Sequence, residues 1–287
     1  MAARITLISI SKKNDLTTVK IRNLKHFNYP YHNLIGIGER LKGKSIYKYM
    51  PIENALQCLQ NNNLRFSIPT KWDDPFEKYF YTAGYGNVMP NPEFDTRLFA
   101  CCLTKNNDCE AAWRMYTKDS DKNPCVQFKI YPGQFRKFAE RFVRDKGVEL
   151  YEGLVSYKLT DSEILHLYQR GNKNYPTFFT DFSIEKYLNL MLLKRHFYEY
   201  EGEVRYFIHG NKLCFDKDYI DVTIPWSLCL YSVKLPPNYS DDLKDKLKNA
   251  LELNYELCMK DYQGYYPQRI TPIENTLYAP LEPITVE

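Results

Sequence analysis

The strongest pattern of hydrophobic and polar positions lies in residues 46–77, which read IYKYMPIENALQCLQNNNLRFSIPTKWDDPFE. A strand-like run at 46–50 passes into an amphipathic helix, whose inward positions are Ile52, Ala55, Leu56 and Leu59. Residues 64–68 then alternate between apolar and polar side chains, as in a strand with one buried face, and Pro69 ends that run. This stretch therefore predicts a strand, a helix and a second strand in close succession.

Polar side chains accompany both predicted strands of this stretch. Strands that follow each other closely along a chain are usually neighbours in the sheet, so their polar residues face a common space. We therefore predict one cleft lined by five side chains, namely Tyr47, Lys48, Tyr49, Arg65 and Ser67.

The same patterns place further elements along the chain. Strands are predicted at 5–10, 17–21, 98–103, 125–130, 155–159, 198–210, 219–224 and 229–234. Helices are predicted at 110–116, 133–146, 184–197 and 240–259, the last with Ser240 or Asp241 as its N-cap. Residues 27–33 and 82–96 are expected to be loops, and the tail after Gly264 shows no clear element.

These elements favour one elaborated α+β domain over two, since neither an internal repeat nor a low-complexity linker interrupts the chain. We expect a single domain over 1–287. Within it, residues 1–45 would form a lead-in, residues 46–210 the core, and residues 211–287 a C-terminal part of strands and one helix.

The composition is that of a globular protein, with 44% hydrophobic and 26% charged residues among 287. No apolar run approaches the roughly 18 residues needed to span a bilayer. The apolar run near the start is short, broken by Ser9 and followed by lysines, unlike a signal peptide. The eight cysteines are scattered without metal-ligand spacing. We expect a cytoplasmic protein with reduced thiols, no bound metal and no membrane contact.

Charge is concentrated near the start of the chain. The net charge is +4, yet residues 1–48 hold ten Lys or Arg and only two Asp or Glu. Such a segment, including Lys12 and Lys13, would contact the phosphates of a nucleic acid, although a solvated basic face without a ligand is equally common. The 25 tyrosines would stack on bases where exposed, while most of them are expected to fill the core.

One carboxylate has the sequence context of a positioned functional group. Glu203 precedes Arg205 by two residues on a predicted strand, so the arginine would hold the carboxylate in a defined pose. Glu201 competes with it on the same predicted strand face, and Gly202 between them lets the backbone bend. A surface pair of Glu and Arg is the plainer interpretation of the same residues.

Other candidate groups carry weaker signals. Asp73, Asp74 and Glu77 would bind a divalent metal through oxygen atoms, or cap a loop. Trp113 and Tyr116 share a helix face and would either stack on a ring or fill the core. The five histidines form no HExxH pair, and no GxSxG motif is present, so hydrolase classes are disfavoured.

In order, the segments YKY, LRFSIPTKWDDPFE, the Trp113 and Tyr116 block, VSYKL and YEYEGEVRYFI resemble the DUF2971 family of bacterial proteins over residues 46–210. The Trp-Ser-His-Tyr motif of that family reads Trp113-Arg114-Met115-Tyr116 in this chain. The resemblance therefore implies no catalytic role for the two replaced positions.

The beginning of this region also resembles DarT-type ADP-ribosyltransferases of nucleic acid, in which a strand I-Y-H leads into a helix that begins I-D-N. This chain has Ile46-Tyr47-Lys48 and Ile52-Glu53-Asn54, so Lys48 stands where those enzymes carry His. The resemblance implies a mixed, split β-sheet core of the ADP-ribosyltransferase type with flanking helices, and NAD as the cofactor.

The same resemblance implies roles for individual residues. Glu203 would bind the ribose 2′-hydroxyl and stabilise the positive charge that develops as nicotinamide leaves. NAD would be held by Tyr47, Lys48, Tyr49, Asn54, Ser67, Trp72 and Arg205. The acceptor nucleic acid would be held by Asp73, Asp74, Trp113, Tyr116, Lys12 and Lys13.

These roles predict an NAD-dependent ADP-ribosyltransferase that modifies nucleic acid, with RNA favoured, as a toxin or anti-phage effector. A toxin implies an antitoxin partner, and the nearest arrangement adds a chaperone. The first alternative is a non-catalytic module that binds nucleotide or protein in a degenerate cleft, which Lys48 in place of His favours. The second is a metal-dependent nuclease that uses Asp73, Asp74 and Glu77.

Overall fold

The computed structural model describes residues 45–72, 74, 77, 98–117, 123–157, 188, 191–210, 217–237 and 239–275, together with the backbone of 5–13, 16–23 and 32–35. The chain folds as two compact units, each assembled from separate stretches. Unit 1 comprises Met1–Lys42, Arg65–Leu103 and Lys137–Val222. Unit 2 comprises Gly43–Leu64, Thr104–Arg136 and Thr223–Glu287.

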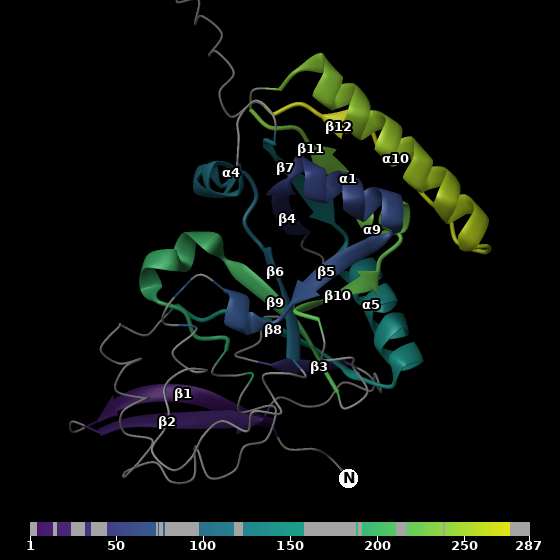
Figure 1. Cartoon of the computed structure of the whole chain (residues 1–287). Helices are drawn as coiled ribbons and strands as arrows, with labels where there is room; N and C mark the ends of the chain where they lie inside the picture. The colour runs from purple at the N-terminus through teal and green to yellow at the C-terminus, as the bar shows by residue number, and fades with distance from the viewer. Residues whose placement is uncertain are drawn as a thin grey trace, which may run out of the picture. The chain divides into compact units, whose positions relative to one another are not determined.

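Unit 2 is built on a mixed sheet (Figure 1) that contains β4 (Ile46–Pro51), β7 (Cys125–Ile130), β11 (Leu230–Lys234) and β12 (Pro272–Ile273). β4 and β7 are antiparallel, with Tyr49 opposite Gln127. β11 is antiparallel to β7 on the other side and parallel to β12. Residues opposite each other in antiparallel strands share a sheet face, so Tyr49 and Gln127 point to one face and Phe128 to the other.

Helices cover the Phe128 face of this sheet. They are α1 (Ile52–Asn61), α9 (Trp226–Cys229) and α10 (Asp241–Asp261), of which α1 and α10 lie side by side in Figure 1. The ring of Trp226 meets Phe128 edge-on at 5.2 Å between centroids. Ser240 is the N-cap of α10, because its hydroxyl accepts a hydrogen bond from the Leu243 backbone N–H, as the sequence predicts.

The other face of the sheet carries the short helix α4 (Glu110–Tyr116). Ala112 and Trp113 of α4 are buried against Tyr47, Tyr49 and Cys125 of the sheet. Trp113 therefore packs in the core of unit 2, which is the plainer of its two predicted roles.

Unit 1 also has a mixed sheet, in which β6 (Leu98–Thr104), β9 (Glu203–His209), β8 (Glu149–Leu154) and β3 (His32–Ile35) lie side by side in that order. β8 and β9 are antiparallel and β3 is parallel to β8. β5 (Asn63–Ser67) pairs with β6 through Ser67 and Ala100, and also with β10 (Tyr219–Thr223). A separate hairpin joins β1 (Ile5–Lys13) to β2 (Leu16–Asn23).

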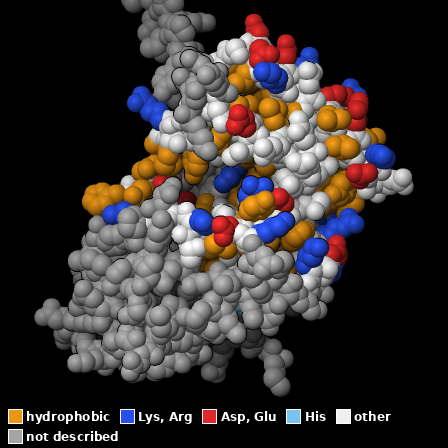
Figure 2. All heavy atoms as spheres, in the orientation of Figure 1, with side chains coloured by type: hydrophobic (Ala, Val, Ile, Leu, Met, Phe, Trp, Pro, Cys, Tyr) orange, Lys and Arg blue, Asp and Glu red, His pale blue; other side chains and the backbone are white. Residues whose placement is uncertain are grey.

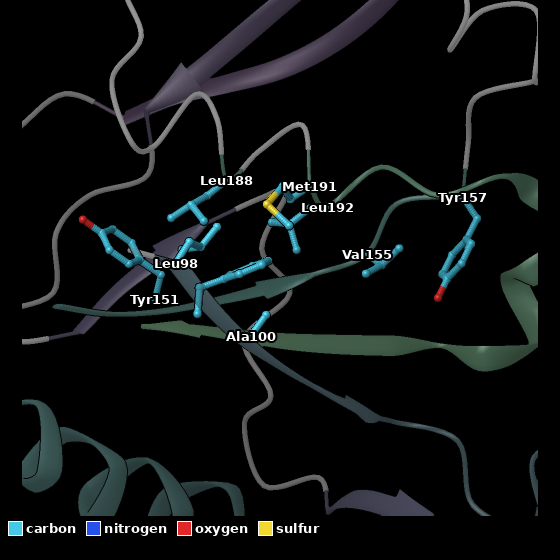
Figure 3. Packing of buried hydrophobic residues seen from close by; sticks show 9 residues of the cluster. Leu98, Ala100, Tyr151, Val155, Tyr157, Leu188, Met191 and Leu192 are labelled. Atoms are coloured by element: carbon cyan, nitrogen blue, oxygen red, sulfur yellow. The ribbon is translucent and has the colours of Figure 1, made fainter. Parts of the chain in front are cut away.

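The core of unit 1 forms where β6, β8 and β9 meet a segment that precedes β9. Figure 3 shows Leu188, Met191 and Leu192 pointing toward the strands that carry Leu98 and Tyr151. These residues are at most 3% exposed. Burying each such side chain contributes on the order of 1.5–3 kcal/mol. The segment that leads into β9 is therefore fixed by its own apolar side chains.

The fold class is α+β with mixed sheets, as predicted. The strands predicted around 46–50, 64–68, 98–103, 125–130, 219–224 and 229–234 are present, as are α1, α4, α10 and the amphipathic helix α5 (Pro132–Lys146). None of the helices in the described part of the chain is long and apolar enough to cross a bilayer. The predicted loop at 82–96 lies outside the described residues.

Several predicted boundaries are wrong. Of the strand expected at 155–159, residues 155–157 carry only an isolated bridge at Ser156, and 158–159 lie outside the described residues. The strand β8 precedes them at 149–154, and the loop expected at 27–33 overlaps β3. The strand expected at 198–210 starts only at Glu203, because the 3-10 helix η2 (His196–Glu201) precedes it. Residues 191–195 form turns and extended backbone, so the predicted helix does not reach 197. Two short elements, α9 and β12, were not predicted.

Candidate functional site

A buried ionic cluster lies at the start of β9 in unit 1. Residues 203–208 are all buried, so both faces of this strand are covered and its charged residues are enclosed. Glu203 is 7% exposed and Arg205 is 1% exposed. They are two residues apart and therefore share one face of the strand. A charged pair in such a place is stable only if hydrogen bonds satisfy both groups.

Glu203 has both carboxylate oxygens bound. Lys194 Nζ donates to Oε1 at 2.5 Å, and Arg205 Nε donates to Oε2 at 2.7 Å. The backbone N–H of Glu203 donates to the Tyr157 hydroxyl at 2.9 Å. The carboxylate is therefore held in one pose by two cations. The contact with Arg205 was predicted from the spacing of the two residues, and the contact with Lys194 was not.

Arg205 uses its whole guanidinium group. Besides Glu203, it donates from Nη1 to the Met191 carbonyl at 2.5 Å and from Nη2 to Glu77. The Trp72 ring lies against the guanidinium, 4.2 Å from its central carbon. A planar guanidinium is suited to such a site because it can donate in its plane while an aromatic ring packs on its face.

A second carboxylate binds the same lysine. Glu201 Oε2 lies 2.5 Å from Lys194 Nζ. Glu201 ends η2, and Gly202 follows with a positive φ of 50°, a conformation that glycine adopts without strain. Glu201 therefore reaches the cluster from a turn and does not share a strand face with Glu203, contrary to the prediction.

The environment separates the pKa values of the two carboxylates. Burial would raise the pKa of Glu203, but Arg205, a hydrogen bond with Glu201 and Lys194 together hold it well below its usual value. Burial, the hydrogen bond to Glu203 and the negative charge of Glu203 raise the pKa of Glu201 to about 8, against the opposing effect of Lys194. At neutral pH, Glu201 is therefore mostly protonated and donates to an ionised Glu203.

Charge balance explains this proton. Two cations, Lys194 and Arg205, meet three carboxylates, those of Glu77, Glu201 and Glu203. Burial raises the pKa of Glu77 as well, against the effects of Arg205 and Lys194. With one carboxyl protonated, the group of five side chains is electrically neutral.

An outer layer of the cluster contains Asp74 and the aromatic residues of η2. Arg195 Nη2 donates to Asp74 Oδ1 at 2.9 Å and to the Tyr198 hydroxyl at 3.0 Å. The Tyr198 ring also lies 4.7 Å from Lys194 Nζ. Phe197 and Tyr200 of the same helix are exposed. The helix that leads to the buried carboxylates therefore carries two exposed aromatic rings.

Of the residues predicted for the site, this cluster brings together Trp72, Asp74, Glu203 and Arg205. Ser67 lies in the same unit, half-buried at the end of β5. Asp73 lies outside the described residues. Lys12 and Lys13 end β1, opposite Thr17 and Leu16, in a part of the chain where only the backbone is described.

The remaining predicted residues belong to unit 2. Tyr49 is buried between Trp113, edge-on at 5.2 Å, and Tyr116, stacked at 6.5 Å. Its hydroxyl accepts from Gln127 Nε2 at 2.6 Å and from the Cys109 backbone N–H at 3.1 Å. Burial is the main cause that raises the pKa of Tyr49 to about 12. These contacts give Tyr49 a structural role within unit 2.

Three other residues of unit 2 were predicted to bind NAD. Tyr47 is buried beside Tyr49, Lys48 is half-buried and Asn54 is exposed on α1. Tyr116 is 37% exposed. The convergence of Tyr47, Lys48 and Ser67 with Glu203 on one cleft stays a prediction.

Sequence reasoning missed Lys194 and Arg195 and gave Glu77 only a role in metal binding or a loop. Both cations lie near the end of the predicted helix 184–197, three and four residues after Met191, and so on or beside its apolar face. A charged residue at such a position is the one local signal that could have indicated them. Their function depends on tertiary packing, because Lys194 meets a strand that begins nine residues later.

Among the described residues, no group of His, Cys, Asp or Glu has the arrangement of a metal site. Figure 2 shows acidic and basic side chains mixed over the described surface that faces the viewer. The chain matches no family model, no curated protein and no solved structure.

Proposed function

We propose that this protein is an NAD-dependent ADP-ribosyltransferase that modifies nucleic acid, with RNA as the favoured acceptor. The observation that carries the proposal is the pair of Glu201 and Glu203, two buried carboxyl groups on one lysine with widely separated pKa values. Such a separation is what acid–base chemistry at neutral pH requires, because one group stays ionised while the other exchanges a proton.

The residues of the cluster fit the sugar of NAD. Each oxygen of Glu203 accepts one hydrogen bond from a cation, and Glu201 donates a third. The two oxygens of a carboxylate can accept about four in all, which leaves one position for a further donor. A ribose hydroxyl supplies such a donor. Trp72 is only partly buried beside Arg205 and offers a ring for the nicotinamide. NAD is the second substrate and supplies the ADP-ribosyl group.

Within this proposal, the two carboxylates have distinct tasks. The ionised Glu203 stabilises the positive charge that develops on the ribose as its bond to nicotinamide breaks. Glu201, when it is deprotonated, takes the proton of the acceptor atom that forms the new bond. Lys194 and Arg205 act as positioning residues, because they fix the carboxylates without touching the reacting atoms.

A non-catalytic binding module is the second candidate, and the burial of Glu203 favours it. A carboxylate that is 7% exposed and bound by two cations is also what a purely structural ionic network contains. The nuclease alternative receives less support, because Arg195 binds Asp74 and Arg205 binds Glu77.

Labelled NAD tests the proposal directly. The purified protein is incubated with NAD and, separately, with RNA, DNA and a protein mixture, and transfer of label is measured. We expect transfer to RNA and a loss of at least about 100-fold in turnover for Glu203→Gln, the scale of one lost electrostatic group. Glu199→Gln changes an exposed carboxylate of η2 and serves as the matched control.

Two results would reject transferase activity. One is the absence of transfer to every acceptor, and the other is full activity of the Glu203→Gln variant. Nucleotide binding without turnover would support the binding module instead. As a toxin, the protein would have an antitoxin partner and, in the nearest arrangement, a chaperone. Loss of toxicity in cells that express Glu203→Gln would link toxicity to the same carboxylate.

A further inference from the structure

The sheet of unit 2 has a partly open face that the carboxylate chemistry of the proposed function does not use. Alternation along β7 places Gln127, Lys129 and then Tyr131 on the face opposite Phe128. Helix α4 covers the Gln127 end of this face through Tyr49 and Trp113. Lys129 and Tyr131, farther along, are only half-buried.

The neighbouring strand β11 adds an exposed aromatic ring beside them. Tyr231 stands at a register shift between β11 and β7 and is 52% exposed. Lys129 Nζ lies 4.2 Å from the centre of its ring, and Tyr131 meets the ring edge-on at 5.2 Å. A bulge directs a side chain away from the regular ladder, which accounts for the exposure of Tyr231.

The charge on this face is positive. Lys129 has no carboxylate partner among the described residues, so its charge is not neutralised there. Lys234 of β11 forms an ion pair with Asp108, and that acidic group is therefore balanced. An exposed tyrosine that is held in place by a second ring, next to an uncompensated lysine, matches one base and one phosphate of a single strand.

We propose that Lys129, Tyr131 and Tyr231 form a platform that binds single-stranded nucleic acid, with a base stacked on Tyr231 and a phosphate on Lys129. This inference deepens the proposed function, and it rests on that function only where it assigns the bound strand the role of ADP-ribosyl acceptor. Binding itself needs neither NAD nor the carboxylates of unit 1. A duplex, whose bases are already stacked, would gain only the phosphate contact.

Binding is measured with the full chain and a fluorescently labelled oligouridylate, without NAD, at several salt concentrations. Tyr231→Leu removes the ring and should weaken binding by about 5-fold or more, the lower limit for one stacked base. Tyr231→Phe keeps the ring and should bind like the parent. Lys129→Gln should reduce the slope of log affinity against log salt by about 0.7, the value for one phosphate of a single strand.

Lys246→Gln is the control, because Lys246 is an exposed lysine of the same unit on α10 that already pairs with Asp242. It should change affinity and salt slope less than Lys129→Gln. Parent-like binding by both Tyr231→Leu and Lys129→Gln would overturn the platform, and so would equal binding of a duplex of the same length. If the platform binds but no variant or acceptor shows transfer from NAD, the proposed function fails while this inference stands.

Discussion

Glu201 and Glu203 bind the same ammonium group, since Lys194 Nζ lies 2.5 Å from an oxygen of each. Two buried carboxylates that share one ammonium group cannot both be ionised without an energetic cost. Burial and the neighbouring Glu203 accordingly raise the pKa of Glu201 to about 8. The cluster therefore stores one exchangeable proton in the range where cells operate. Function and stability should both depend on that proton.

The first prediction concerns the pH dependence of transfer. If Glu201 accepts a proton from the acceptor, turnover should rise with pH and level off above about 8, following the raised pKa of Glu201. Glu201→Gln should lower turnover and remove this rise, because a glutamine does not titrate. Rates measured between pH 6 and 9 for the parent, Glu201→Gln and Glu199→Gln decide the matter. A rise that persists in Glu201→Gln would assign the proton to another group.

The second prediction concerns stability. Glu201 has a raised pKa in the folded state, so its contribution to stability is complete below its unfolded value of 4.5 and is lost as pH rises toward 8. Glu203 has a lowered pKa and contributes in the opposite sense, with stability present above 4.5 and lost as pH falls below it. Stability should therefore fall from pH 5 to pH 8 in the parent.

Urea unfolding at pH 5, 6, 7 and 8 tests this dependence. Glu201→Gln should flatten the decline, because its side chain stays neutral at every pH. Glu199→Gln, at an exposed position, should retain the decline of the parent. An unchanged slope in Glu201→Gln would place the exchangeable proton elsewhere, for example on Glu77, whose pKa is also raised by burial.

The third prediction separates buried from exposed arginines in unit 1. Arg205→Gln leaves Glu203 and Glu77 short of a cation in a buried place and should cost about 3–5 kcal/mol of stability. Arg65→Gln removes an arginine that pairs with Asp221 while its side chain is 54% exposed, and it should cost less than about 1 kcal/mol. Chemical unfolding of both variants measures the difference. Equal losses would mean that burial does not govern the Arg205 network.

The sequence predicts those elements whose residues carry the information locally. The spacing of Ile52, Ala55 and Leu59 predicts α1, and the hydroxyl of Ser240 predicts the start of α10. The alternation of Leu64 and Phe66 likewise predicts β5. In each case the side chains themselves form the buried face or the cap.

The ionic cluster was only partly predictable. The i, i+2 spacing of Glu203 and Arg205 indicates their pairing, but the alternating residues before them resemble a continuing strand. The turn at Gly202 depends on a positive φ that a glycine permits without requiring it. The contacts of Lys194 and Glu77 join segments far apart in the sequence, so they follow from packing and leave no local pattern.

The last prediction concerns a buried amide in unit 2. Asn254 of α10 is 0% exposed and joins three elements. Its Oδ1 accepts from the backbone N–H and the hydroxyl of Ser227, at 2.9 and 2.8 Å. Its Nδ2 donates to the Leu59 carbonyl at 2.5 Å and to Asn62 Oδ1 at 2.8 Å. The oxygen of Asn254 thus meets two donors, and its nitrogen meets two acceptors. An amide satisfies all four partners, whereas an ionised carboxylate has no proton for the two acceptors.

Asn254→Asp tests this match with almost no change in shape. At pH 7.5 the aspartate would face the Leu59 carbonyl and Asn62 without a proton to donate, so we expect a loss of about 3 kcal/mol or more. At pH 5 the loss should be smaller, because the native state favours the protonated acid, which restores one donor. Asn249→Asp, at an exposed position of the same helix, should change stability little at either pH. A loss in Asn254→Asp that is independent of pH would show that shape, rather than hydrogen bonding, joins α10 to α1 and α9.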